Sequence, residues 1–207
     1  LGCEKASSFL GKYLKENYKF ETKMSEDNRK FWDASAVKFN SLVESYTLPV
    51  IKDCEDYARA LGNEDFITAV TVCGTTGSYF TDRQRQAFSE LGLKVPKTDA
   101  EKGTAYSALL DGKKVVREKT KAGVAKTKPY TWGEDTFGVV SGDLSHSGKT
   151  LVTVGENEYK VNKPGLNIVV YDKTLGQVVD VVNFDTTQEG VPAKHVKQPL
   201  IEDDGGE

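Results

Sequence analysis

The 207-residue sequence predicts an α+β protein. Apolar residues recur at helical spacing in the first third of the chain, whereas β-branched and aromatic runs fill most of the second half. One strand–loop–helix unit lies between these two parts. Helices and strands that are segregated along the chain are typical of the α+β class. We therefore expect N-terminal helices followed by a mixed β-sheet or a two-sheet sandwich.

The composition is typical of a folded protein without a membrane span. Apolar residues make up 38% and charged residues 29% of the sequence, which is enough for a hydrophobic core. No stretch approaches the roughly 18 uninterrupted apolar residues that a membrane-spanning helix needs. The net charge of −3 is too small to indicate a charged partner by itself. The three cysteines form no CxxC pair, so we expect neither a disulfide framework nor a zinc knuckle. Only two histidines are present, so we expect no metal site, and no cofactor is expected either.

Residues 1–46 are expected to form an N-terminal helical segment. Apolar residues at helical spacing predict two amphipathic helices, the second of which follows Ser25, a residue type common at N-caps. The apolar positions are Phe9, Leu10, Tyr13 and Leu14 in the first helix and Trp32, Ala36, Phe39, Val43 and Tyr46 in the second.

A third helix is expected to begin after Thr47 and to end at Gly62. Pro49 would lie in its first turn, where a missing N–H group costs no hydrogen bond, and glycine is common just after a helix. The residues expected in the core are Val50, Ile51, Cys54, Ala58 and Leu61.

A strand, a loop and a further helix are predicted next. The run FITAVTV, residues 66–72, is continuously apolar or β-branched, which is typical of a strand buried on both faces. A glycine-bearing loop follows at 74–77. Thr81 and Gln84 then have the spacing of a capping box, in which each side chain accepts a hydrogen bond from the other residue's backbone. A helix is therefore expected from Thr81 to Leu91.

Strands joined by turns are expected to fill the second half of the chain. Residues 106–119 predict two strands joined at Asp111 and Gly112, a pair common in hairpin turns. Residues 121–128, rich in Lys, Thr, Ala and Gly, are expected to form an exposed connection. The later strands are FGVV, TLVTV, NEYKV, LNIVVYD and QVVDVVNFD.

The sequence SGDLSHSGKT, residues 141–150, has the glycines and the Lys-Thr pair of a phosphate-binding loop. Such a loop has four residues between its first glycine and Gly-Lys-Thr, and a helix N-terminus that holds the anion follows it. Here five residues intervene, and the β-branched run LVTV follows. We therefore expect a hairpin connection rather than a nucleotide site.

No catalytic residues are expected. Neither His146 nor His195 lies beside a recognisable nucleophile motif, and each is expected to be a solvated loop residue. Cys73 ends a predicted strand near the start of a helix, where a thiolate would be stabilised. We prefer to interpret Cys73 as a small buried packing residue, with an enzyme that uses its loop as the alternative.

Residues 113–128 form a basic stretch that is followed by Tyr130 and Trp132. Such a strip with aromatic residues nearby could hold single-stranded nucleic acid or an anionic polysaccharide. The preferred interpretation is a hairpin edge that lysines protect against pairing with other chains, and nucleic acid is not an expected partner. The cations are Lys113, Lys114, Arg117, Lys119, Lys121, Lys126 and Lys128.

The segment KPGLNIVVYDKTLGQVVDVVNFDT, residues 163–186, resembles the signature hairpin of the interleukin-like EMT inducer/PANDER domain, also called the GG domain. In that hairpin a Gly-x-Asn strand, a glycine-containing turn and a Phe-Asp segment follow one another. The corresponding residues are Gly165, Asn167, Gly176, Phe184 and Asp185. Residues 47–118 are similar to the later half of the same domain, which runs from a helix to a closing hairpin.

The two blocks occur in the opposite order from that of the family. Either the chain is a circular permutant, or it contains the end of one copy and the start of another. We prefer the permutant, because LNIVVYD and FITAVTV are each apolar enough to need neighbours on two faces and could supply them to each other. The GG-like domain is then expected over residues 47–190, followed by an acidic C-terminal tail at 191–207.

The resemblance implies a non-catalytic binding module. The family includes secreted signalling proteins of animals, a sugar-binding stem domain in a protein O-mannose N-acetylglucosaminyltransferase, and modules attached to bacterial surface-glycan enzymes. It therefore implies a glycan as the ligand and an extracellular or cell-surface location. A sugar site needs aromatic faces and planar polar groups. The residues expected to supply them are Trp132, Tyr130, Asn167 and Asp185.

Two alternatives remain open at this point. Asn167 and Asp185 could bond their own turns, and Trp132 could belong to the core. The chain could also be a protein-interaction or structural component that docks on a partner protein through its N-terminal helices. The apolar residues for such docking would be Phe31, Trp32 and Phe39.

Overall fold

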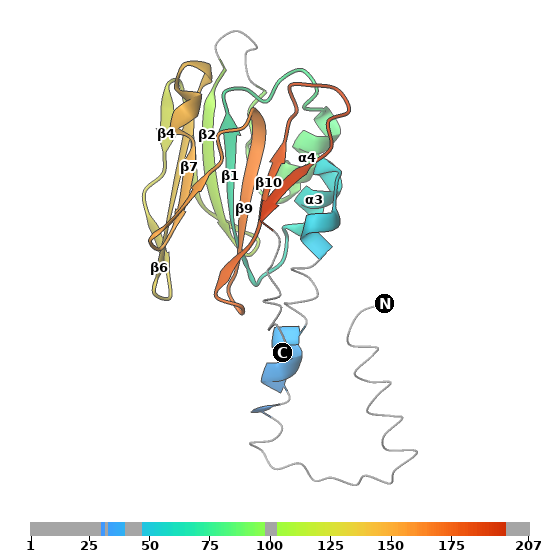
Figure 1. Cartoon of the computed structure of the whole chain (residues 1–207), viewed down its shortest axis with the longest axis vertical. Helices are drawn as coiled ribbons and strands as arrows, with labels where there is room; N and C mark the ends of the chain where they lie inside the picture. The colour runs from blue at the N-terminus through green and yellow to red at the C-terminus, as the bar shows by residue number, and fades with distance from the viewer. Residues whose placement is uncertain (1–29, 32, 40–46, 98–102, 198–207) are drawn as a thin grey trace, which may run out of the picture. The chain divides into compact units, whose positions relative to one another are not determined.

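The computed structural model describes residues 30–31, 33–39, 47–97 and 103–197 (Figure 1). The expected helix around Phe9 and Leu14, the positions Trp32, Val43 and Tyr46, and most of the predicted acidic tail (198–207) lie outside the described residues. The chain divides into two compact units, Leu1–Val43 and Glu44–Glu207. None of the described helices is long and apolar enough to cross a membrane.

The described part of the first unit is helical. Residues 30–31 and 33–39 have helical backbone, and Ser35 Oγ donates a hydrogen bond to the Phe31 carbonyl at 2.8 Å. The side chains of Phe31, Val37 and Phe39 are all exposed. An expected helix is therefore present here, and several of its apolar side chains stay in contact with solvent.

The second unit begins with two short helices, η1 (Leu48–Val50) and α3 (Cys54–Ala60), where the sequence predicted one longer helix. Asp53 caps α3, because its Oδ1 accepts hydrogen bonds from two backbone N–H groups of the first turn at 2.8 and 3.1 Å. Ile51 is extended and ends the preceding turn. The predicted burial of Val50 is therefore wrong, since this residue is 70% exposed.

Helix α4 (Asp82–Glu90) has the predicted capping box. Thr81 Oγ1 accepts a hydrogen bond from the Gln84 N–H at 3.2 Å, and Gln84 Oε1 accepts one from the Thr81 N–H at 2.9 Å. The helix ends at Leu91, and Gly92 follows with a φ of 82°. Both predicted ends of this helix are therefore confirmed.

The strands form two sheets, and every ladder between named strands is antiparallel. The six-stranded sheet has the order β11-β10-β9-β1-β2-β3, and the other sheet has the order β4-β6-β7-β8 with β5 paired to β6. The first contains β1 (Phe66–Cys73), β2 (Ala105–Asp111), β3 (Lys114–Lys121), β9 (Gly165–Asp172), β10 (Gln177–Phe184) and β11 (Lys194–Lys197). The second contains β4 (Val124–Lys126), β5 (Tyr130–Trp132), β6 (Asp135–Gly142), β7 (Leu151–Val154) and β8 (Asn157–Lys160). The α+β class is confirmed, and the sheets are antiparallel rather than mixed.

Strand β1 lies inside the six-stranded sheet, between β2 and β9. Every residue of β1 and every residue of β9 is buried, as the continuous apolar sequences predicted. Phe66 pairs with Asp172 and Val72 pairs with Leu166. The expected association of the two apolar segments is therefore found.

Two hydrophobic clusters cover the two faces of the six-stranded sheet. On one face, Val70 of β1 belongs to a cluster with Tyr57 of α3 and Phe88 of α4. On the other face, Ala69 belongs to a cluster with Phe137 of β6. The helices and the second sheet thus lie on opposite sides of the six-stranded sheet, as Figure 1 shows.

Residues 121–128 are not the exposed connection that their composition predicted. Residues 124–126 form β4, which pairs with β6 at the border of the second sheet. Ala125 is fully buried, and its carbonyl accepts a hydrogen bond from Ser107 Oγ at 2.8 Å. Its methyl group is small enough to fit between the sheets, whereas Lys126 is exposed. The segment therefore connects the two sheets.

The connection between β6 and β7 is a 3₁₀ helix, η2 (Leu144–Lys149). Asp143 precedes it, and its Oδ1 accepts a hydrogen bond from the Ser145 N–H at 3.1 Å. The strand β7 follows at once, and β6 and β7 pair with each other. The predicted hairpin connection is confirmed, and no α-helix begins after Thr150 to hold a phosphate.

Candidate functional site

A pocket with a volume of about 180 Å³ lies where the C-terminal end of β10 meets the N-terminal ends of α3 and α4. We call it the Asp185 pocket. Its polar or aromatic lining includes Lys52, Asp53, Tyr79, Gln84, Asp185 and Gln188. Carboxylate, amide and ammonium groups thus line the pocket together with the rings of Tyr79 and Phe184.

Asp185, one of the predicted ligand-binding residues, is held by its own turn. Its Oδ1 accepts hydrogen bonds from the N–H and hydroxyl groups of Thr187 at 3.1 and 2.5 Å, and its Oδ2 accepts one from Gln188 Nε2 at 3.1 Å. A carboxylate offers about four acceptor positions. The fixed carboxylate can therefore accept a further hydrogen bond from a ligand.

Tyr79 supplies an aromatic ring and is 45% exposed. Its backbone N–H donates to the Thr186 carbonyl at 3.1 Å. Two residues earlier, Gly77 has a φ of 70° and approaches Thr187 so closely that a Cβ would lie 2.5 Å from the Thr187 Cα. The loop that carries Tyr79 and the turn that carries Asp185 are therefore fixed against each other.

Asn167, the second predicted residue, is 2% exposed and does not line the Asp185 pocket. Its Nδ2 donates to the Lys163 carbonyl at 2.8 Å, and its Oδ1 accepts from Asn183 Nδ2 at 3.2 Å. These contacts tie the loop before β9 to β9 and β10. Both the nitrogen and the oxygen of the Asn167 side-chain amide are thus hydrogen-bonded within the protein.

Tyr130 and Trp132 lie on β5, and both are half-buried. The Tyr130 hydroxyl donates to Asp111 Oδ2, and this hydrogen bond raises the pKa of Tyr130 to about 12. The Trp132 ring packs edge-on against Tyr171, with ring centres 6.1 Å apart. Lys173 Nζ lies 2.8 Å from Asp111 Oδ1 and completes a network that joins the end of β2, β5 and the turn after β9. Both aromatic rings therefore contribute to the core at this end of the sheets.

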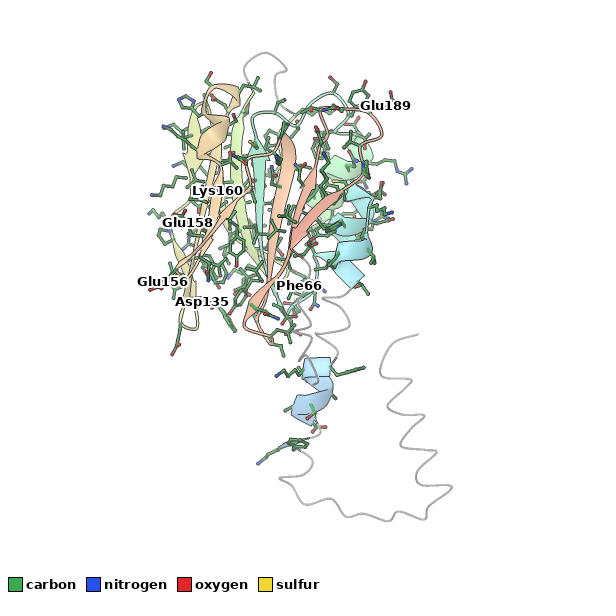
Figure 2. The ribbon with its side chains drawn as sticks, in the orientation of Figure 1. Phe66, Asp135, Glu156, Glu158, Lys160 and Glu189 are labelled. Carbon is green, nitrogen blue, oxygen red and sulfur yellow. The ribbon has the colours of Figure 1, made fainter. Side chains whose placement is uncertain are left out.

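The four predicted residues do not form one site. Trp132 contacts Tyr171 near the end of β9, whereas Asn167 is four positions earlier, a separation of about 13 Å along a strand. Asp185 follows β10 at the end where Phe184 pairs with Leu166. Figure 2 shows Asp135, the cross-strand neighbour of Trp132, at the opposite end of the sheets from Glu189 of the pocket turn. Only Asp185 belongs to the pocket.

A buried polar network beside the pocket was not predicted from the sequence. Asp180 is fully buried on β10, and its Oδ2 accepts a hydrogen bond from the Tyr57 hydroxyl at 2.7 Å. His195 Nδ1 lies 2.8 Å from the same oxygen, and His195 Nε2 lies 3.0 Å from the Ile51 carbonyl oxygen. The prediction that His195 is a solvated loop residue is wrong, because it lies on β11 and its side chain is 8% exposed.

The electrostatics of this network favour a charged imidazole ring. Burial by itself would lower the pKa of His195, but the hydrogen bond and the negative charge of Asp180 raise it, and so does the Ile51 carbonyl. The net pKa of His195 lies above its ordinary value. Both ring nitrogens face acceptors, which only the doubly protonated ring can satisfy. The network therefore joins β11, β10 and the start of α3 through an ion pair.

Neither described cysteine has the environment of a nucleophile. Cys73 is 2% exposed, burial raises the pKa of its thiol, and its Sγ donates to the Ser147 carbonyl at 3.6 Å. Burial also raises the pKa of Cys54. The preferred interpretation of Cys73 as a buried packing residue is confirmed.

Alkylation should therefore be slow in the native state. In a Cys3→Ser background, we expect Cys54 and Cys73 to react with iodoacetamide at neutral pH only after denaturant is added, because both thiols are buried and protonated. Mass spectrometry of the labelled protein measures this. Rapid labelling of Cys73 in the native protein would contradict its interpretation as a buried packing residue.

Within the described residues, no group of three or more His, Cys, Asp or Glu side chains is arranged to hold a metal ion. Comparison of the chain with family models, with curated proteins and with solved structures finds no match.

Proposed function

We propose that the protein is a non-catalytic module that binds carbohydrate at the Asp185 pocket. The observation that carries the proposal is the half-exposed Tyr79 ring beside the planar polar groups of Gln84, Asp185 and Gln188. Sugars bind to sites of this kind, because an aromatic face packs on their C–H groups while amides and carboxylates bond their hydroxyl groups.

The resemblance to the GG domain supports this proposal. Asp185 and Phe184, the Phe-Asp pair of the proposed signature, both line the pocket. Gly165 of the same signature lies beside Phe184 and Thr186. We propose further that the second unit is a GG-like two-sheet sandwich in circularly permuted order. The pairing of β1 with β9 supports this relation, because it joins the two blocks that resemble the family.

A glycan-array screen with matched variants tests the proposal. We expect selective binding by the native chain and a loss of about twofold to tenfold in affinity for Tyr79→Ala, since one aromatic contact contributes about 0.5–1.5 kcal/mol. Gln188→Ala should also weaken binding. Leu144→Ala, an exposed apolar change elsewhere on the same unit, should leave it unchanged.

The Trp132→Ala variant distinguishes the two ends of the sheets. If binding is lost in folded Trp132→Ala but kept in Tyr79→Ala, the glycan lies at the Tyr130 and Trp132 end. A folded chain that binds none of a diverse set of glycans would contradict the proposed function. Circular dichroism of each variant shows whether it is folded.

A second candidate function is docking on a partner protein through the helix in the first unit. Phe31 is 65% exposed, Val37 50% and Phe39 58%. Apolar residues that stay exposed on a helix are typical of an interaction surface. A partner that the native chain retains in a pull-down, and that the double variant Phe31→Ser/Phe39→Ser loses, would support this function.

A further inference from the structure

A row of lysines lies where a border of one sheet meets a border of the other. β3 is an edge strand of the six-stranded sheet, and β4 lies at an edge of the second sheet. Arg117 of β3 links the edge of the six-stranded sheet to the segment after β4. Its Nη2 donates to the Pro129 carbonyl at 3.3 Å, and its guanidinium lies 5.7 Å from the Tyr130 ring centre. We call this border the basic edge, and we define it by Lys119, Lys121, Lys126 and Lys128.

The cross-strand register places these lysines close together. Lys119 and Lys121 stand opposite Ser107 and Ala105 of β2, so all four residues share one face of the sheet. Ser107 bonds the Ala125 carbonyl, and Ala125 directly precedes Lys126. The lysines of β3 and those of the β4 segment therefore flank the same corner.

Among the described residues, the lysines of the basic edge are not paired with carboxylates, and Asp143, which lies near Lys121 and Lys126 through its bond to the Gly123 N–H at 2.7 Å, is paired with His146. All four lysines are exposed, and within the described part of the chain none of them forms an ion pair. The one carboxylate in β3, Glu118, stands opposite Ala108 and turns to the other face. There it accepts hydrogen bonds from the Tyr106 hydroxyl at 2.7 Å and from the Lys94 N–H at 2.6 Å.

Protection against edge pairing accounts for lysines on each edge strand, because charged side chains, lysine especially, keep an edge strand from pairing with another chain. It does not require that the borders of two sheets carry the same charge side by side. The opposite border of the second sheet, at β8, carries both signs, with Glu156, Glu158 and Lys160 labelled along it in Figure 2. At the basic edge, by contrast, the lysines of both sheets are all positively charged. A surface of this kind attracts an extended anionic partner.

The chemistry of the edge favours a polysaccharide over nucleic acid. Its free cations are all lysines, which attract carboxylate, sulfate and phosphate groups as point charges, without the fork by which arginine recognises nucleic acid. Arg117 is already bonded to the Val116 and Pro129 carbonyls. Single-stranded nucleic acid also needs exposed rings on which bases stack. Here Arg117 covers the Tyr130 ring, and Trp132 is half-buried against Tyr171.

We propose that the basic edge binds a linear anionic polysaccharide whose carboxylate or sulfate groups pair with Lys119, Lys121, Lys126 and Lys128. This surface is separate from the Asp185 pocket and goes beyond the function proposed for it. The lysines would hold the chain by charge along its length, and the neutral sugar rings would need no pocket.

Binding to dextran sulfate, polygalacturonate and neutral dextran of similar length tests the proposal. We expect the native chain to bind one or both polyanions with an affinity that falls as NaCl is raised, and not to bind neutral dextran. Lys119→Glu/Lys126→Glu should bind about tenfold more weakly, because two ion pairs are lost and each lysine is replaced by a carboxylate that repels the polyanion. The control Lys160→Glu/Lys163→Glu has the same change in net charge and should bind as the native chain does.

Three results would overturn the proposal: no binding of either polyanion, an equal loss in both double variants, or tighter binding of oligo(dT) than of both polyanions at the same salt. If Lys119→Glu/Lys126→Glu does not fold, Lys121→Gln/Lys128→Gln is measured instead, with Lys160→Gln/Lys163→Gln as its control. Tyr79→Ala should leave polyanion binding unchanged. Failure at the Asp185 pocket and failure at the basic edge are therefore distinguishable.

Discussion

Replacing His195 with alanine is expected to lower the free energy of unfolding by about 3–5 kcal/mol. The reason is that Asp180 is completely buried and would lose the cationic partner that lies 2.8 Å away. Tyr57 alone would remain as its hydrogen-bond donor among the described side chains. Urea unfolding near pH 6, followed by circular dichroism, measures the change.

Two controls separate the ion pair from general damage to the C-terminal strand. Lys194→Ala lies on the same strand and is exposed, so it should change the free energy of unfolding by less than about 0.5 kcal/mol. Tyr57→Phe removes one hydrogen bond to a charged group and should cost about 1.5–3 kcal/mol. A loss below about 1 kcal/mol in His195→Ala would contradict a charged, buried pair.

The same ion pair makes stability depend on pH in a stated direction. The pKa of His195 is raised in the folded protein above its ordinary value of 6.5. Its contribution to stability is therefore fully present below pH 6.5 and is lost as the pH rises through the folded-state pKa. The difference in free energy of unfolding between the native chain and His195→Ala should shrink over that range. A difference in free energy of unfolding that grows with pH would contradict a raised pKa for His195.

Replacing Gly165 with alanine is expected to destabilise the protein by about 2–5 kcal/mol. Gly165 has a φ of 89°, where a side chain costs about 1–2 kcal/mol. A Cβ at this position would also overlap the Phe184 carbonyl oxygen and would lie 2.8 Å from the Thr186 nitrogen. Overlap with backbone adds about 1–3 kcal/mol, because neighbouring strands must shift. Thermal and urea unfolding measure the loss.

Gly176→Ala is the matched control for this prediction. Gly176 belongs to the same hairpin and has a φ of 66°, but the nearest atom to its Cβ position is the Tyr171 hydroxyl oxygen at 3.9 Å. Only the backbone conformation is then unfavourable, at a cost of about 1–2 kcal/mol. Equal losses in the two variants would show that the contact with residues 184–186 contributes nothing.

The central strands and the capped helix could be predicted because their signals are local. FITAVTV and LNIVVYD consist mainly of apolar and β-branched residues, and Thr81 with Gln84 forms a cap that depends on four neighbouring residues only. By contrast, β4 has no strand signal in its sequence. Ala125 is buried because Ser107 and β6 surround it, and these groups come from distant parts of the chain.

The candidate site was harder to predict for the same reason. The sequence indicated Asp185 through its resemblance to a known hairpin, but Tyr79, Gln84 and Gln188 belong to other segments and carry no motif for a ligand. His195 lies in a short, polar strand, and its burial depends on Asp180 and Ile51. Only the arrangement of the chain in three dimensions shows that these side chains meet.

The position of β1 between β2 and β9 means that β1 is synthesised long before one of its two partner strands. β2 follows β1 after one helix, but Asp172, the partner of Phe66, is synthesised much later. Contacts between residues so distant in sequence slow folding. Until β9 has left the ribosome, one hydrogen-bonding border of a mainly apolar strand has no partner and can pair with other chains. We expect newly made chains to aggregate most readily during this interval, and expression at reduced temperature to raise the soluble yield.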